Sequence, residues 1–224
     1  MPKHKQALPT LKGRKVYLGF SGGPDATALA AKLQNQGAIV IPVYIDYRAS
    51  AGGKTSKDLR FARQSAQILG LSEPLVVRAP LGERPKSERN RFFIEVLTNA
   101  AQEGGSNLVA LGTMLATYEA GGDWDEESNR DLDPATLGAH AQKVGVTIIT
   151  WDSFAVTTKS GEFSGLKPKQ RKAVAATTSC QMWWRVECGN CGSCKERRAA
   201  FLTAFGKDET NYRPGSKAAQ MTAP

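Results

Sequence analysis

The chain has 224 residues, a formal net charge of +9, and a composition that is 41% hydrophobic and 23% charged. These proportions are typical of a folded protein with one core and exclude a disordered or fibrous chain. No apolar run approaches the roughly 20 residues that span a bilayer, and residues 1–15 are polar and basic. We therefore expect a cytoplasmic protein that has no membrane partner.

The excess of positive charge suits a polyanionic partner, either nucleic acid or ATP, because lysine and arginine bind phosphate. Many of these residues are scattered, and several lie near the ends of the chain, such as Lys3, Lys5 and Arg213. A solvated surface explains the charge equally well. Nucleic-acid binding is therefore possible but not expected.

The first elements predict a strand, a tight loop and a helix. Residues 16–20 form a short apolar run that breaks at the glycines of residues 21–24. Asp25 then opens a segment with helical spacing of apolar residues, which ends at Gly37. A second apolar run over residues 39–46 completes a β-α-β unit.

The alternation of helices and strands continues along most of the chain. Helices are expected from residue 55 or 56 to Gly70, from Ser87 to Gly104, from Pro134 to Val144 and from Lys195 to Phe205. Strands are expected over residues 75–78, 108–111 and 146–151. Five strands that alternate with helices predict an α/β fold with an open, mostly parallel five-stranded sheet flanked by helices. The acidic residues 116–133 are too many for a simple connection, and we expect a flap or a disordered excursion there.

The loop after the first strand has features of a phosphate-binding site. Its sequence, Ser21-Gly22-Gly23-Pro24-Asp25-Ala26-Thr27, directly follows Phe20. Glycines let the backbone approach a polyphosphate, and the next helix offers free N–H groups at its N-terminus. The loop lacks the lysine of a Walker A loop and the third glycine of a dinucleotide fingerprint. The alternative is an ordinary glycine-rich turn in which Asp25 caps the helix.

Asp46, at the end of the second predicted strand, is a candidate nucleotide-binding residue. Open α/β sheets place their ligands at the carboxyl ends of the strands, so the adenine and ribose of a nucleotide could bind there. Asp46 can equally cap the next turn.

All four cysteines lie within fifteen residues near the C-terminus: Cys180, Cys188, Cys191 and Cys194. Such clustering favours metal binding over disulfides that join distant segments. Gly189 and Gly192 permit the sharp turns that direct the thiolates to one centre. The spacing suits a closed, structural zinc site, and an iron–sulfur cluster or reactive thiols are the alternatives.

The loop and the cysteine motif together resemble the 7-cyano-7-deazaguanine synthase family of the adenine-nucleotide alpha-hydrolase (PP-loop) superfamily. The resemblance extends to Thr178-Ser179-Cys180, to residues 195–201, to Arg89-Asn90 with Phe92-Phe93, and to Gly112, and it spans approximately residues 16–205. Ala26 departs from the pattern, because the family usually has serine there. Residues 48–53 and 116–133 also lack family motifs, and in the latter only Asp131 or Asp133 can stand in for the missing aspartate.

The resemblance implies ATP, magnesium and zinc as cofactors, and a 7-deazaguanine substrate, 7-carboxy-7-deazaguanine, with ammonia. The implied nucleotide-binding residues are Phe20, Ser21, Gly22, Gly23, Pro24, Asp25, Ala26, Thr27, Asp46 and Gly112. The implied catalytic residues are Asp25, which could hold magnesium, Arg89, which could meet a phosphate or the substrate carboxylate, and Lys159 after the fifth strand. A helix cap or surface charges are the alternatives for these three. The family often forms dimers, so a homodimer is possible.

These assignments divide the chain into four parts. We expect a flexible basic N-terminus over residues 1–15, a nucleotide-binding α/β domain over 16–154, a zinc-binding segment over 155–205 and a flexible tail over 206–224. A related PP-loop enzyme that modifies tRNA and a relative that has lost its chemistry are the alternative functions. Either tRNA or DNA could receive the product.

Overall fold

The computed structural model describes residues 8–47, 57–79, 88–113, 134–180 and 186–216. Five strands form one parallel sheet: β1 (Lys15–Gly19), β2 (Ile39–Asp46), β3 (Leu75–Arg78), β4 (Leu108–Leu111) and β5 (Thr147–Ile149). Their order is β3-β2-β1-β4-β5, which confirms the predicted open sheet. The order changes direction between β1 and β4, and parallel α/β sheets bind ligands at such a switch point.

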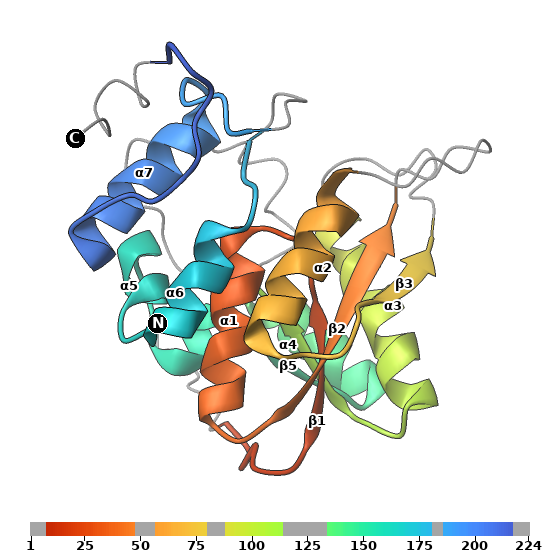
Figure 1. Ribbon diagram of the computed structural model, residues 1–224. Helices are drawn as coiled ribbons and strands as arrows, with labels where there is room; N and C mark the ends of the chain where they lie inside the picture. Colours follow the sequence, from red (N-terminus) through yellow and green to blue (C-terminus); the bar gives the residue numbers. More distant parts are fainter. Residues whose placement is uncertain (1–7, 48–56, 80–87, 114–133, 181–185, 217–224) are drawn as a thin grey trace.

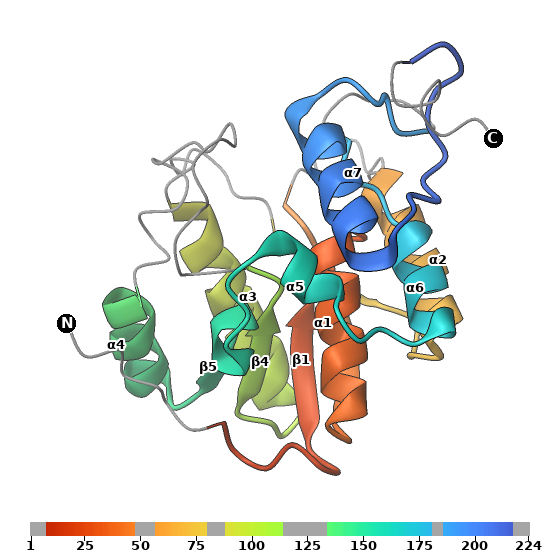
Figure 2. The same cartoon turned by 90° about the vertical axis from the view of Figure 1, so that its left-hand side faces the viewer.

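Helices cover both faces of the sheet (Figures 1 and 2). They are α1 (Pro24–Asn35) and α2 (Lys57–Leu69) on one face, and α3 (Arg89–Glu103) and α4 (Pro134–Val144) on the other. Side chains of β2 point alternately to the two faces of the sheet. Val40 and Tyr44 pack in the larger core cluster with α1, whereas Val43 packs with Ile94 of α3. This double cover explains why the strands read as nearly continuous apolar runs.

The C-terminal part packs on the side that α1 and α2 cover (Figure 2). It consists of the 3-10 helix η3 (Trp151–Phe154), α5 (Lys159–Phe163), α6 (Pro168–Ala175) and α7 (Gly192–Phe205). Phe163 and Phe201 meet edge to face, with ring centroids 5.1 Å apart, and so join α5 to α7. The sequence did not predict α5 or α6, because five and eight residues are too few to show a helical period.

The structure differs from the predicted flexible ends. Leu11 is 5% exposed and belongs to the main core, so this residue anchors the segment before β1. In the tail, Tyr212 is 4% exposed, and Arg213 N donates to Glu187 O at 2.8 Å. Burial of Tyr212 and this backbone hydrogen bond tie residues 206–216 to the cysteine segment.

Two predicted elements have different bounds. β5 ends at Ile149 because Thr150 caps η3: its amide donates to Ser153 Oγ at 3.1 Å. α7 begins at Gly192, three residues before its expected start at Lys195. The predicted flap over residues 116–133, the turn over 48–53 and the helix start at 55 or 56 lie outside the described residues. Within the described part of the chain, the helices are too short or too polar to cross a membrane.

Candidate nucleotide site and metal centre

The backbone of the glycine loop is shaped before any ligand binds. Phe20 is buried, and its amide donates to Val43 O at 2.7 Å, which fixes the end of β1 against β2. Gly22 has φ +80°, and a Cβ there would lie only 2.6 Å from Asp58 O. Only glycine fits this position between the loop and α2. Gly23 is the N-cap of α1, and no side chain caps the helix there, so the first N–H groups are available to an anion.

Gly112 lets the end of β4 approach the first turn of α1. A Cβ at Gly112 would lie 2.6 Å from Ala26 N. Ala26 is itself 5% exposed and packs in the core. Gly112 therefore lies against the first turn of α1 for a steric reason, and its role in nucleotide binding stays a prediction.

The two hydroxyls of the loop differ in their surroundings. Thr27 is fully buried, and its Oγ1 donates to Gly23 O at 3.0 Å. The Thr27 hydroxyl thus stabilises the loop through its hydrogen bond to the backbone of Gly23. Ser21 is exposed, so it is the loop hydroxyl that faces solvent.

The structure brings together two residues that the sequence placed 134 positions apart: Lys159 Nζ forms an ion pair with Asp25 Oδ1. Their side chains are 21% and 33% exposed, so the pair lies at the edge of the protein interior. Thr158 caps α5 by accepting a hydrogen bond from Gly161 N at 3.1 Å, and this cap sets the direction in which α5 presents Lys159.

Glu162 is a third member of this cluster, and the sequence analysis missed it. Its Oε2 lies 3.7 Å from Lys159 Nζ, and its side chain is 1% exposed. The spacing of three residues from Lys159 on a helix was the available signal. It carried no weight because α5 itself was not predicted.

Burial and the two nearby carboxyl groups shift the pKa values of Glu162 and Lys159. Burial, together with the nearby charge of Asp25, raises the pKa of Glu162 to about 10. For Lys159, burial acts to lower the pKa, but the carboxylate of Asp25 and then Glu162 outweigh it and raise the pKa. Burial therefore favours the neutral form of Glu162, beside the ion pair between Lys159 and Asp25.

The other predicted catalytic and nucleotide-binding residues lie on the strand ends and on α3. Asp46 is 4% exposed at the carboxyl end of β2. It lines a hollow of about 410 Å³ with residues that include Arg63 and Arg78. Arg89 begins α3, but its side chain lies outside the described residues, so its role stays a prediction.

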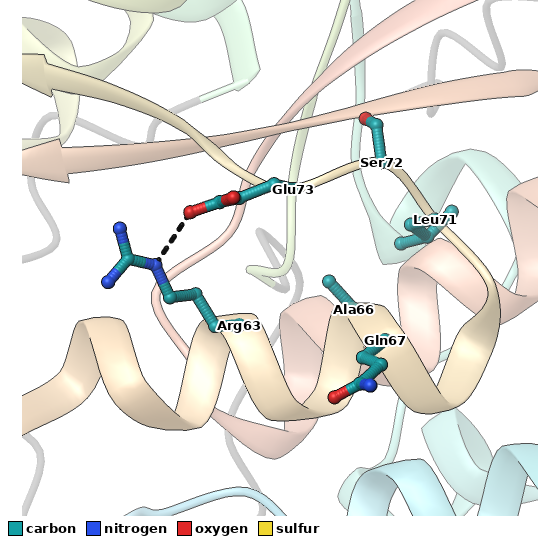
Figure 3. A pocket seen from close by; sticks show the side chains of 6 residues that line it. All are labelled: Arg63, Ala66, Gln67, Leu71, Ser72 and Glu73. Atoms are coloured by element: carbon teal, nitrogen blue, oxygen red, sulfur yellow. Dashed lines mark ion pairs between the residues drawn. The ribbon is translucent and has the colours of Figure 1, made fainter.

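A larger hollow, of about 560 Å³, lies farther along α2 and shares Arg63 with the first one (Figure 3). It is formed by the C-terminal half of α2 and the connection to β3, where Arg63 Nε pairs with Glu73 Oε1 at 2.8 Å. Both side chains are more than half exposed, so this ion pair contributes little to stability. None of the predicted catalytic residues lines it.

The four cysteines converge, as predicted. The Sγ atoms of Cys180, Cys188, Cys191 and Cys194 all lie within 4.8 Å of one another. The Cys188 and Cys194 sulfurs are 3.8 Å apart. Tetrahedral zinc with bonds of about 2.3 Å requires sulfurs about 3.8 Å apart, so the donor set fits this ion.

Backbone amides support the thiolate character of the centre. The amides of Asn190 and Cys191 each donate to Cys188 Sγ at 3.4 Å. Burial acts to raise the pKa of Cys188, but these hydrogen bonds outweigh it and lower the pKa to about 7. Burial raises the pKa of Cys194, so a metal ion would have to displace its proton. Four thiolates leave no position for water, which is the property of a structural site.

Residues 178–180, which we call the strap, join the cysteine centre to the glycine loop. Thr178 N donates to Gly22 O at 3.0 Å, only two residues before Cys180. The Ser179 amide donates to Glu187 Oε1 at 3.2 Å. The predicted phosphate loop and the predicted metal segment are therefore in direct contact.

Arg197 of α7 holds the base of this strap. The residue is 1% exposed, and its guanidinium donates to the carbonyl oxygens of Val174, Ala175 and Thr177 and to the hydroxyls of Thr177 and Thr210, at 2.9–3.2 Å. Three of these acceptors are carbonyl groups at the C-terminal end of α6, where a cation is favourable. Arg197 therefore ties α6, the strap and the tail together.

Fold and site together define an α/β protein with a glycine loop before an uncapped helix N-terminus and four converging cysteines that could hold a metal ion. Comparison with curated proteins shows which proteins of this class the chain is similar to. It is 24% identical over 223 residues to a 7-cyano-7-deazaguanine synthase of Rhizobium rhizogenes, covering 88% of this chain and 92% of the relative. It is 26% identical to the enzymes of that name from Chelativorans sp. and Agrobacterium fabrum, again over 88% of the chain. The resemblance predicted from the loop and the cysteines is therefore confirmed over most of the chain.

No family model matches the chain. A solved structure described as a predicted subunit of tRNA methyltransferase from Methanocaldococcus jannaschii is similar with a TM-score of 0.42 and 18% identity, covering 92% of this chain and 94% of that one. This likeness is too distant to add to the argument.

Proposed function

We propose that the protein is an ATP-dependent enzyme that converts 7-carboxy-7-deazaguanine and ammonia into 7-cyano-7-deazaguanine. The observation that carries this proposal is the Asp25–Lys159 ion pair at the uncapped N-terminus of α1, next to the glycine loop. A cation beside an uncapped helix N-terminus supports binding of a phosphate group there. The similarity to curated 7-cyano-7-deazaguanine synthases supports the choice of substrate.

The chemistry requires activation because a carboxylate is a poor target for ammonia. AMP would first be transferred from ATP to a carboxylate oxygen, and pyrophosphate would leave. Ammonia would then displace AMP and give the amide, with loss of a proton. A second ATP would adenylate the amide oxygen, and departure of AMP with the remaining N–H proton would give the nitrile. One site can therefore serve both rounds.

The residues of the loop would act on the departing pyrophosphate. The free N–H groups at the start of α1, and the Lys159 ammonium, would stabilise its negative charge. Magnesium would add positive charge between the phosphates, and the Asp25 carboxylate is the group of the loop that would hold it. Asp46, at the end of β2, would bind the nucleoside part of ATP.

The zinc centre would be structural in this proposal. Its four thiolates would complete the coordination of the ion, and the strap from Cys180 to Gly22 would support the loop.

Turnover by the purified protein tests the proposal. We expect the nitrile, the amide and AMP when ATP, magnesium, ammonium and 7-carboxy-7-deazaguanine are supplied, with mass spectrometry as the readout. Lys159→Ala should lower AMP formation by about 100-fold, the effect of losing one group that stabilises transition-state charge. Lys172→Ala, on the exposed face of α6, is the matched control and should leave the rate unchanged.

A second candidate is a nucleotide-binding relative without this chemistry. The specific observation in its favour is that Ala26 supplies no hydroxyl and the Thr27 hydroxyl is bonded to Gly23 O. ATP binding measured by calorimetry, without any AMP from the deazapurine acid, would support this candidate against the enzyme.

A further inference from the structure

Glu162 has a carboxyl group that the packing of the fold does not require. The residue is 2% exposed and neighbours Phe163, which α5 buries fully in the core. A buried carboxyl group costs free energy relative to an apolar side chain of similar volume. In the described part of the chain, Glu162 Oε2 accepts no hydrogen bond, so this oxygen does not satisfy a backbone amide. A function outside packing is the better explanation for the group.

The neighbours of Glu162 point to that function. Its Oε2 is 3.7 Å from Lys159 Nζ, whose other partner is Asp25 of the glycine loop. Lys159 and Glu162 lie three residues apart on the same helix and therefore on one face of it. The capped first turn of α5 fixes both, because Gly161 fits closely under Thr158 Oγ1.

We propose that Glu162 is a positioning residue that holds the Lys159 ammonium at the N-terminus of α1, where the pyrophosphate of ATP would depart. A lysine has four rotatable bonds in its stem, and the carboxyl groups of Asp25 and Glu162, which also contact each other, restrict the ammonium before ATP binds. When phosphate arrives, the ammonium can turn from Asp25 toward it while Glu162 keeps it at the site. This inference rests on the proposed function.

Two variants separate positioning from packing. Glu162→Leu keeps the volume and removes the carboxyl group, whereas Glu162→Gln keeps the polar shape. We expect Glu162→Leu to unfold at the same or a higher temperature than the wild type and to lose at least about tenfold in kcat for pyrophosphate release, with KM for ATP changed less than threefold. Such a split removes an interaction that acts in the transition state. Glu162→Gln should recover part of kcat, and Glu103→Gln, at an exposed position of α3, should change nothing.

A second measurement needs no catalysis and so tests Glu162 even if the proposed function is wrong. Lys159 is acylated with acetic anhydride, and its modification is followed by mass spectrometry with the exposed Lys167 as an internal reference. We expect Lys159 to react several-fold faster in Glu162→Leu than in the wild type, because loss of the neighbouring carboxyl group favours the free amine, which is the form that attacks the anhydride. Equal rates of labelling, or a fall of melting temperature and kcat together with unchanged labelling, would overturn the proposal. Faster labelling in a protein that makes no AMP would retain the positioning role and reject the proposed reaction.

Discussion

The glycine loop and the cysteine centre touch each other but obtain their shapes by different means. The loop is shaped by backbone: Gly22 takes φ +80° against α2, and Gly112 leaves room for Ala26. The centre is shaped by four side chains whose sulfurs converge within 4.8 Å. A backbone loop is formed before its ligand arrives, whereas a thiolate centre gains much of its stability from the metal. The backbone-shaped loop is thus anchored, through Thr178, to a centre whose four sulfurs could hold a metal ion.

Loss of the metal is expected to have the largest effect. Cys194→Ser should remove one zinc per chain and lower the melting temperature by about 10 °C, because a structural site contributes several kcal/mol. Metal analysis and calorimetry would measure both. Ser193→Ala, one residue away, is the control and should keep the metal. A protein that melts at the same temperature after its metal is removed would contradict the comparison.

Arg197 tests whether the cysteine segment is also held by ordinary hydrogen bonds. Arg197→Met leaves several buried carbonyl oxygens without donors and should cost roughly 3–5 kcal/mol in the free energy of unfolding, measured in denaturant. Lys172→Met, on the exposed face of α6, should cost less than about 0.5 kcal/mol. If the two variants were equally stable, Arg197 would not be the support that its contacts indicate.

Gly22 tests the backbone origin of the loop. Gly22→Ala meets both a left-handed φ and a contact of 2.6 Å with Asp58 O, so we expect a loss of about 2–3 kcal/mol and at least tenfold weaker ATP binding. Gly13 has φ +75° with open space around its Cβ position. Gly13→Ala should therefore cost only about 1 kcal/mol and leave ATP binding intact. Similar results for the two variants would mean that the contact with α2 is unimportant.

The strap between the two regions predicts that metal binding at the cysteines is coupled to ATP binding at the loop, with a smaller effect than the substitutions above. If Thr178 supports Gly22 through one backbone hydrogen bond, chelation of the metal should weaken ATP binding about fivefold, which corresponds to about 1 kcal/mol. Calorimetric titration of ATP into metal-loaded and chelated protein would measure it at a temperature where both are folded. An unchanged affinity would show that the loop is independent of the centre.

The Glu162 cluster predicts an effect of pH on the stability of the fold. The pKa of Glu162 is raised from 4.5 to about 10 by burial and then by Asp25, so the folded state keeps a proton that the unfolded chain releases. Stability from this group is full below about pH 4.5 and falls as the pH rises toward 10. Melting curves between pH 5 and 9 should therefore show the wild type losing stability relative to Glu162→Gln. Parallel curves would place the ionised carboxylate in the folded state.

Much of the fold could be predicted because its strands are short apolar runs that end at glycine or polar residues. The run before Ser21 and the run that ends at Asp46 gave β1 and β2 within one residue. The helices α5 and α6 could not be predicted, because their buried residues, such as Phe163 and Val174, are too few to show a period. The packed tail was missed because Tyr212 is a lone apolar residue among polar ones.

The sequence by itself determined the alternation of strands and helices, the glycine loop and the cluster of four cysteines, since each depends on neighbours along the chain. Only the tertiary structure decided which distant groups meet. It brought Lys159 and Glu162 to Asp25, set Gly112 against Ala26, and joined Thr178 to Gly22. These contacts depend on how α5, α6 and β4 pack around α1, and the spacing of residues along a chain carries no record of that packing.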